Sequence, residues 1–145
     1  MKAKIWAVLI FAAILGMELL FRGSAHAGDV IIIANKNAPA SSMSKEDIRI
    51  VFLAKKDQWD NGQKIDFVIL QDCPEHADFL MKYLKKTSSQ FQRYFKTLIF
   101  TGKGRAPRAF KTEKELVAYV AATEGAIGYV STGTDISSVR VLTVN

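Results

Sequence analysis

The spacing of apolar residues along the chain predicts several short strands. Residues 30–34 form an unbroken apolar and mostly β-branched run, which is typical of a strand buried on both faces and indicates a parallel sheet. Strand composition returns at 65–70 and at 125–130, and the valines of 139–144 predict a closing strand. Four strands are therefore expected.

Segments with helical spacing lie between these strands. Helix starts are marked by capping residues at Ser44, Asp72, Thr87 and Thr112, each followed three positions later by an acidic residue or a glutamine. After each start, apolar residues recur at intervals of three and four, as one buried stripe requires. The glycines and the proline of 102–107 then end the third helix.

Strands that alternate with helices across short connections are the pattern of an α/β domain. The connectors at 35–42 and 55–64 are polar and turn-rich, and no internal repeat or low-complexity tract interrupts the alternation. The length from residue 28 onward suits one compact domain, so we expect a single domain over 28–145.

The first 27 residues have the three parts of an export signal. Lys2 and Lys4 give a positive start, residues 5–15 form an apolar core, and the Ala-His-Ala of 25–27 is a small-x-small cleavage pattern. Glu18 favours this interpretation over a membrane-spanning helix, which needs a longer stretch without a carboxylate. We therefore expect a periplasmic or secreted domain, with an uncleaved signal as its route to membrane attachment.

Charge is distributed unevenly along the chain. The whole sequence has 20 basic and 14 acidic side chains, yet no carboxylate falls between Asp78 and Glu113, where nine lysines and arginines occur. This asymmetry indicates an anionic partner for the basic half, or else the solvated faces of two helices. Nucleic acid is not expected, because the nearby aromatics have core spacing and the export signal removes the usual partner.

Catalytic and metal-binding chemistry is not indicated. Cys73 is the single cysteine, so no intrachain disulfide can form, and Cys73 with His76 falls short of the four ligands of a structural zinc site. No nucleophile elbow accompanies the serine, histidine and aspartate residues. We expect a protein that is not an enzyme and that needs neither a metal nor a cofactor.

Three segments carry a resemblance to a known family. The segment MSKEDIRIVFLAKK (43–56) with Trp59, the segment FTGKGRAPR (100–108) and the segment GAIGYV (125–130) resemble, in this order, segments of the phosphate-binding periplasmic proteins of ABC transporters and their short, single-lobe relatives. The resemblance implies a single lobe of the type II periplasmic binding protein fold, with a mixed sheet flanked by helices. It also implies phosphate or another small oxyanion as the ligand.

The resemblance places the family's phosphate-binding turn at Gln71, Asp72, Cys73, Glu75 and His76. The receptors typically have an arginine and a Ser-Gly-Thr turn at this point, where backbone N–H groups and hydroxyls hold the phosphate. This chain has two carboxylates instead, which we expect to cap the helix start themselves. The turn is therefore expected to be degenerate as a phosphate site.

The glycine-rich loop before residue 109 is the better candidate for an anion site. Its glycines, Gly102 and Gly104, would let backbone N–H groups approach a ligand closely. A hydroxyl and three cations would complete an oxyanion cradle, and they belong to Thr101, Lys103, Arg105 and Arg108. The other interpretation of the loop is an ordinary basic connection between two helices.

Two functions remain open from the sequence. In the first, the domain is a solute-binding protein that captures phosphate or a similar anion, linked to phosphate ABC transport. In the second, it is a lobe without a ligand that contacts another envelope protein through its basic face, as an interaction or signalling module. The carboxylates of the 71–76 turn favour the second function, and the basic loop favours the first.

Overall fold

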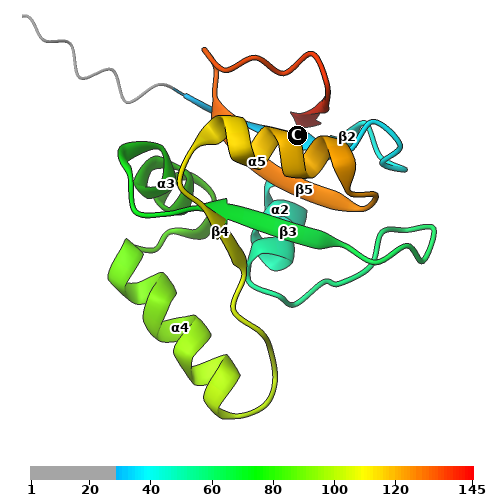
Figure 1. The fold of residues 1–145 in the computed structure, drawn as a ribbon. Coiled ribbons are helices and arrows are strands. Elements are labelled where there is room, and N and C mark those ends of the chain that lie inside the picture. The colour runs from blue at the N-terminus through cyan, green and yellow to red at the C-terminus, as the bar shows by residue number, and fades with distance from the viewer. Residues whose placement is uncertain (1–28) are drawn as a thin grey trace, which may run out of the picture.

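The computed structural model describes residues 29–145, so the expected signal at 1–27 lies outside the described residues. Figure 1 shows a sheet with helices on both faces and one helix at the periphery. The strands are β1 (Val30–Ala34), β2 (Ser42–Met43), β3 (Asp66–Leu70), β4 (Arg108–Phe110), β5 (Ala126–Ser131) and β6 (Arg140–Val144). The helices are α2 (Lys45–Phe52), α3 (Pro74–Phe79), the π-helical turn η1 (Leu80–Leu84), α4 (Ser88–Phe100) and α5 (Glu113–Ala122).

The six strands form one mixed sheet in the order β2-β6-β1-β5-β3-β4. Strand β1 is antiparallel to both of its neighbours, β5 and β6, whereas β3 is parallel to β4 and to β5. The prediction of an α/β fold with a mixed sheet is confirmed. The prediction of a parallel environment for residues 30–34 is wrong, because burial on both faces reports covering helices and not the direction of neighbouring strands.

Helices cover both faces of the sheet, and neighbouring residues of β5 show how. Gly128 faces α5 so closely that an added Cβ would lie 2.8 Å from the Leu116 side chain. Tyr129 points to the other face, where its ring contacts Phe52 of α2 and Phe79 of α3. Figure 1 shows α5 on one side of β5 and α2 on the other. The core therefore extends through the sheet on both sides.

Predicted capping residues start three of the helices. The Ser44 hydroxyl accepts from the Asp47 N–H at 3.0 Å, and the Thr112 hydroxyl accepts from the Glu115 N–H at 3.2 Å. Thr87 forms a complete capping box at the start of α4. These caps satisfy backbone donors that the first turn of a helix leaves free.

The turn before β5 is held by a close backbone approach. Gly125 has a φ of +80°, and a Cβ added there would lie 2.2 Å from the Lys64 carbonyl oxygen. The Trp59 indole N–H donates to the Gly125 carbonyl at 3.2 Å. The long connection between α2 and β3 is therefore anchored to the start of β5.

Three elements were not expected from the sequence. Strands β2 and β4 are two and three residues long, and each forms only through pairing with a strand distant in the sequence. The second predicted helix continues from α3 into the π-helical turn η1, which ends at Lys85 with a φ of +54°. Within residues 29–145, no helix combines the length and the apolar character that crossing a bilayer requires.

Candidate binding cavity

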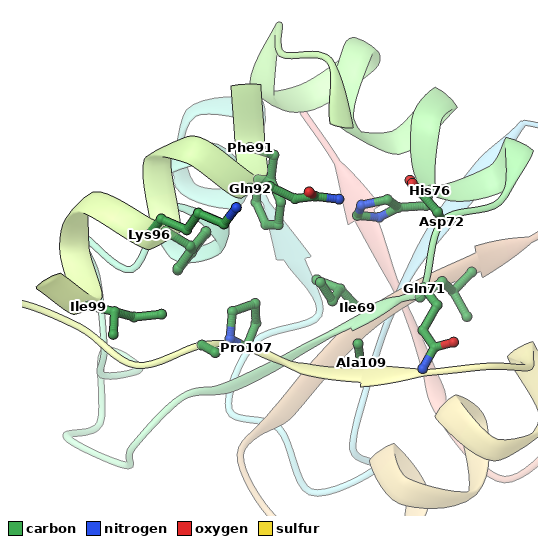
Figure 2. Close-up of a pocket in the computed structure, with 13 residues that line it drawn as sticks. Ile69, Gln71, Asp72, His76, Phe91, Gln92, Lys96, Ile99, Pro107 and Ala109 are labelled. Atoms are coloured by element: carbon green, nitrogen blue, oxygen red, sulfur yellow. The ribbon is translucent and has the colours of Figure 1, made fainter. Parts of the chain in front are cut away.

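A cavity of about 370 Å³ lies between α4, the carboxyl end of β3 and the segment that enters β4. Figure 2 shows its walls, with α4 on one side and the β3 and β4 backbones on the other. The carboxyl end of a strand at the start of a helix is where open α/β sheets commonly bind ligands. This position makes the cavity the candidate site.

The segment after β3 supplies one polar end of the cavity. Gln71, Asp72 and His76 all line it, whereas Cys73 and Glu75 of the predicted turn do not. The Gln71 N–H donates to the Phe110 carbonyl at 2.8 Å, which extends the pairing of β3 with β4. The structure thus brings three of the five predicted turn residues to one cavity.

The expected capping role of Asp72 and Glu75 is wrong. The residue at the N-cap of α3 is Cys73, and no side chain caps the helix start. The Asp72 carboxylate instead accepts from the Ser88 hydroxyl at 2.5 Å, which ties the start of α3 to the start of α4. The pattern predicts Asp72 as the N-cap, but the helix begins one residue later. Asp72 therefore lies before the N-cap position, from which a side chain would reach the free N–H groups of α3.

His76 is buried and hydrogen-bonded at one ring nitrogen. The Tyr129 hydroxyl lies 2.5 Å from His76 Nδ1 and accepts from the Leu70 N–H at 3.0 Å. Since the hydroxyl already accepts from Leu70, its own proton is assigned to Nδ1, and the imidazole proton is then on Nε2. Burial lowers the pKa of His76, with the Asp72 charge opposing the shift, and raises the pKa of Tyr129, so both groups stay neutral near pH 7.

His76 therefore presents one N–H donor to the cavity. The residue is only 4% exposed, and it forms part of the cavity wall. Because the Tyr129 hydroxyl holds Nδ1, the ring is positioned with Nε2–H as its free polar group.

Helix α4 supplies the second polar wall. Gln92, Lys96 and Ile99 line the cavity at intervals of four and three residues, so they share one stripe of the helix. Figure 2 shows the Gln92 amide reaching toward the His76 ring, with the Lys96 amino group on the same side. Gln92 and Lys96 were not predicted as site residues, because a polar helical stripe has the same spacing whether it faces solvent or a cavity.

The remaining lining is apolar. Phe91 and Phe95 are buried on the inner side of α4, and Ile69, Pro107 and Ala109 come from β3 and from the segment around β4. The Phe95 ring also contacts Phe67 of β3, with centroids 6.1 Å apart, which holds α4 against the sheet. The cavity thus combines a polar end with an apolar floor.

The backbone donors of the glycine-rich loop are largely engaged. The N–H groups of Thr101, Gly102 and Lys103 donate to carbonyls in the last turns of α4, and Gly102 has the left-handed φ of +70° that this helix ending requires. The Thr101 hydroxyl donates to the Thr97 carbonyl at 2.9 Å. A ligand at this loop could therefore use only the side-chain cations and the remaining backbone N–H groups.

None of the three cations of the loop lines the cavity. Arg108 lies over the ring of Tyr119, 5.0 Å from its centroid, and Lys103 and Arg105 are exposed outside the cavity wall. The uncharged residues Ala106 and Pro107 are the part of this segment that lines the cavity. The oxyanion cradle at 101–108 stays a prediction.

The described residues hold no cluster of metal ligands. Among residues 29–145, no three histidine, cysteine, aspartate or glutamate side chains gather closely enough to hold a metal ion. Cys73 is a free thiol that is partly buried.

No protein-family model and no curated protein matches the chain. Solved structures do match. A protein from Clostridium perfringens, described as a phosphate ABC transporter substrate-binding protein with bound phosphate, aligns with a TM-score of 0.63 at 18% identity. An ABC-type phosphate transport receptor from Vibrio cholerae aligns with a TM-score of 0.56 at 15% identity, and a phosphate-binding protein from Stenotrophomonas maltophilia with 0.60 at 18%.

The chain has the fold of these phosphate-binding proteins. Each alignment covers 81% of this chain, but only 45%, 46% and 39% of the three relatives in the order given. The chain therefore spans less than half the length of the proteins that it matches. The expected resemblance to the phosphate-receptor fold is confirmed at the level of structure.

Proposed function

We propose that this chain is a non-enzymatic binding domain that acts outside the cytoplasm and takes a small oxyanion in the cavity between α3, α4 and β4. The observation that carries the proposal is the set of donors around one cavity at the carboxyl end of β3. These donors are the Gln71 and Gln92 amides, the His76 Nε2–H and the Lys96 ammonium group.

Charge in and around the cavity supports an anionic ligand. Lys96 is the one cation in the lining, and Asp72 is the one carboxylate. The Asp72 carboxylate already accepts a hydrogen bond from the Ser88 hydroxyl, so one of its oxygens is already paired within the protein. The surrounding segment between Asp78 and Glu113 has only basic charges, so the local potential favours an anion.

The solved relatives support phosphate as the first ligand to test. Their printed names are those of phosphate-binding proteins and of a phosphate transport receptor. Because this chain spans less than half of each, we propose that it works as a single lobe and supplies one wall of a site, in association with phosphate ABC transport.

Calorimetry would test the oxyanion proposal. The full chain, purified from the host compartment in which it accumulates, is titrated with phosphate and with sulfate. We expect binding that is weakened in Lys96→Gln and unchanged in Lys111→Gln, an exposed lysine outside both the cavity and the glycine-rich loop. Weakening by an Arg105→Ala, Arg108→Ala double variant, with no effect of Lys96→Gln, would move the site to the glycine-rich loop. No heat at millimolar ligand would reject the proposal.

Export is tested separately. Mass spectrometry of the purified protein is expected to find Gly28 as its first residue, and fractionation is expected to find the protein outside the cytoplasm. A cytoplasmic protein with an intact Met1 end would contradict the proposal.

A second function, contact with another envelope protein, is favoured by the outer end of α4. Phe100 is 94% exposed and Ile99 is 47% exposed, next to the cations Arg93 and Lys96. An exposed aromatic ring among cations is typical of an interaction surface. Photocrosslinking from position 100 is expected to capture one discrete partner, whereas crosslinking from Val141, an exposed apolar residue on β6, is not.

A further inference from the structure

We propose that the oxyanion bound in the cavity is the carboxylate of a small organic acid with an apolar body, and not a free inorganic ion. This inference rests on the proposed function, because it names the ligand class of the same cavity. It follows from three properties of the cavity: its fixed donor, its charge balance and its apolar floor.

The fixed donor is the imidazole of His76. The residue is 4% exposed. The Tyr129 hydroxyl occupies Nδ1, and Nε2–H has no hydrogen-bond partner among the described residues. An N–H group that opens into a cavity is free to donate to an acceptor there, supplied by water or by a ligand. The Gln92 amide, which reaches toward the same ring, adds a second neutral donor (Figure 2).

The charge balance suits a monoanion. Lys96 is one turn along α4 from Gln92 and supplies a single positive charge. Asp72 places a negative charge beside the His76 ring, away from Lys96 (Figure 2). Any anion in the cavity is attracted by Lys96 and repelled by Asp72. For dianionic phosphate the repulsion is doubled and Lys96 balances only half of the ligand charge, whereas a carboxylate has one charge and two oxygens to satisfy.

The apolar floor disfavours an inorganic ion. Ile69, Phe95, Pro107 and Ala109 offer no hydrogen-bond donor from their side chains. A tetrahedral oxyanion held at the polar end would direct some of its oxygens toward this floor. Those oxygens would lose their hydrogen bonds to water and gain none from the protein. An aliphatic or aromatic body would instead bury apolar surface there, and the cavity volume of about 370 Å³ is in the range of organic ligand sites.

The ligand is therefore expected to lie with its carboxylate near His76, Gln92 and Lys96 and with its body toward Pro107 and Ala109. The two ends of the cavity make separate demands on the ligand. A ligand without charge is expected to bind weakly because it lacks the attraction to the polar end. A ligand without an apolar body is expected to bind weakly because it leaves the apolar floor unfilled.

The test is a calorimetric comparison of hexanoate, benzoate, acetate, inorganic phosphate and neutral hexanol on the full chain. Hexanoate and benzoate are expected to bind at least about tenfold more tightly than acetate or phosphate, because their bodies bury additional apolar surface. Hexanol is expected to bind at least about tenfold more weakly than hexanoate, because it lacks the charge that Lys96 attracts.

Variants locate the binding. Lys96→Gln is expected to weaken hexanoate binding, and Ala109→Leu is expected to weaken it by filling the cavity floor. Lys111→Gln, outside the cavity and the glycine-rich loop, is expected to leave hexanoate binding unchanged. Ala109 and Lys96 are both exposed enough for these substitutions to leave the core intact, which circular dichroism and the urea midpoint would check.

The outcomes separate the two proposals. Phosphate binding as tightly as hexanoate overturns the organic-acid assignment and leaves the oxyanion function standing. Hexanol binding as tightly as hexanoate overturns the carboxylate assignment. Hexanoate binding unaffected by Lys96→Gln and Ala109→Leu overturns the location. An absence of binding by every anion tested rejects the proposed function itself.

Discussion

The ring of Tyr129 lies face to face on the ring of Phe79, with centroids 3.8 Å apart and planes 4° apart. This stacking joins β5 to α3 across the core. At the far end of the same ring, the hydroxyl contacts Leu70 at the end of β3 and His76 on α3. One residue therefore connects the three elements that position the His76 donor of the cavity.

Removing that hydroxyl is expected to destabilise the fold. In Tyr129→Phe, the Leu70 N–H and His76 Nδ1 both lose their partner, at about 1–3 kcal/mol of unfolding free energy for each buried group. Urea unfolding measures the loss. Tyr94→Phe is the matched control, because the Tyr94 hydroxyl donates to the Leu53 carbonyl at 2.8 Å from a half-buried position that water can reach. Equal losses in the two variants would contradict the assignment.

Replacing glycine by alanine is expected to lower the stability of the fold more at position 125 than at position 62. Gly62 has a φ of +85° with open space around its Cβ position, so Gly62→Ala is expected to cost about 1–2 kcal/mol from conformation alone. Gly125→Ala adds a collision with the Lys64 carbonyl oxygen, a backbone atom. Gly133→Ala, at an unstrained and open position, is expected to be neutral. The order of urea midpoints checks this, and a midpoint for Gly125→Ala equal to that of Gly62→Ala would refute it.

Stability is expected to fall in mildly acidic solution because of His76. Burial holds its pKa below the ordinary value of 6.5, so the unfolded chain takes up a proton before the folded chain does. The contribution of His76 is complete above about pH 6.5 and is lost as the pH falls from there toward the folded pKa. Asp47, whose pKa is lowered by its hydrogen bond with Ser44, loses its contribution only at more acidic pH, below 3.8.

The measurement for His76 is the urea midpoint between pH 7.5 and pH 5. The slope is expected to be smaller in His76→Gln than in the parent chain, since glutamine does not titrate. A parallel decline in both proteins would assign the acid sensitivity to other groups.

Cys73 is expected to react slowly with iodoacetamide in the folded protein. Burial, with a contribution from Glu75, raises the pKa of its thiol, so less thiolate is present at pH 8 than in the unfolded chain. The position at the start of α3 would by itself favour the thiolate, but that helix has only six residues. Alkylation rates in buffer and in urea give the comparison, and a folded rate equal to the unfolded rate would be the contrary result.

Local patterns in the sequence were enough to predict much of the fold. The strand at 30–34 and the caps at Ser44, Thr87 and Thr112 are confirmed, because each depends on residues within a few positions of one another. Strand direction and the short strand β4 were not predictable in this way. The partner of β4 is β3, about forty residues earlier, and β4 has only three residues, too few to show a strand pattern of its own.

The candidate site was predictable only in part. The family resemblance located the turn at 71–76 but predicted it to be degenerate, with the loop at 101–108 as the better anion site. Gln71, Asp72 and His76 of the turn line the cavity. Gln92 and Lys96 could not be identified, because their helical spacing is that of an ordinary polar face. Only the packing of Phe91 and Phe95 shows that α4 turns this stripe toward Pro107 and leaves space between them.

The two outermost strands of the sheet, β2 and β4, have two and three residues. Strands this short offer too few consecutive amide and carbonyl groups for another chain to add itself to the sheet. Edge-to-edge aggregation is thereby discouraged, even though the sheet is open at both ends. Recognition of this domain through side chains is therefore favoured over strand addition at these two edges.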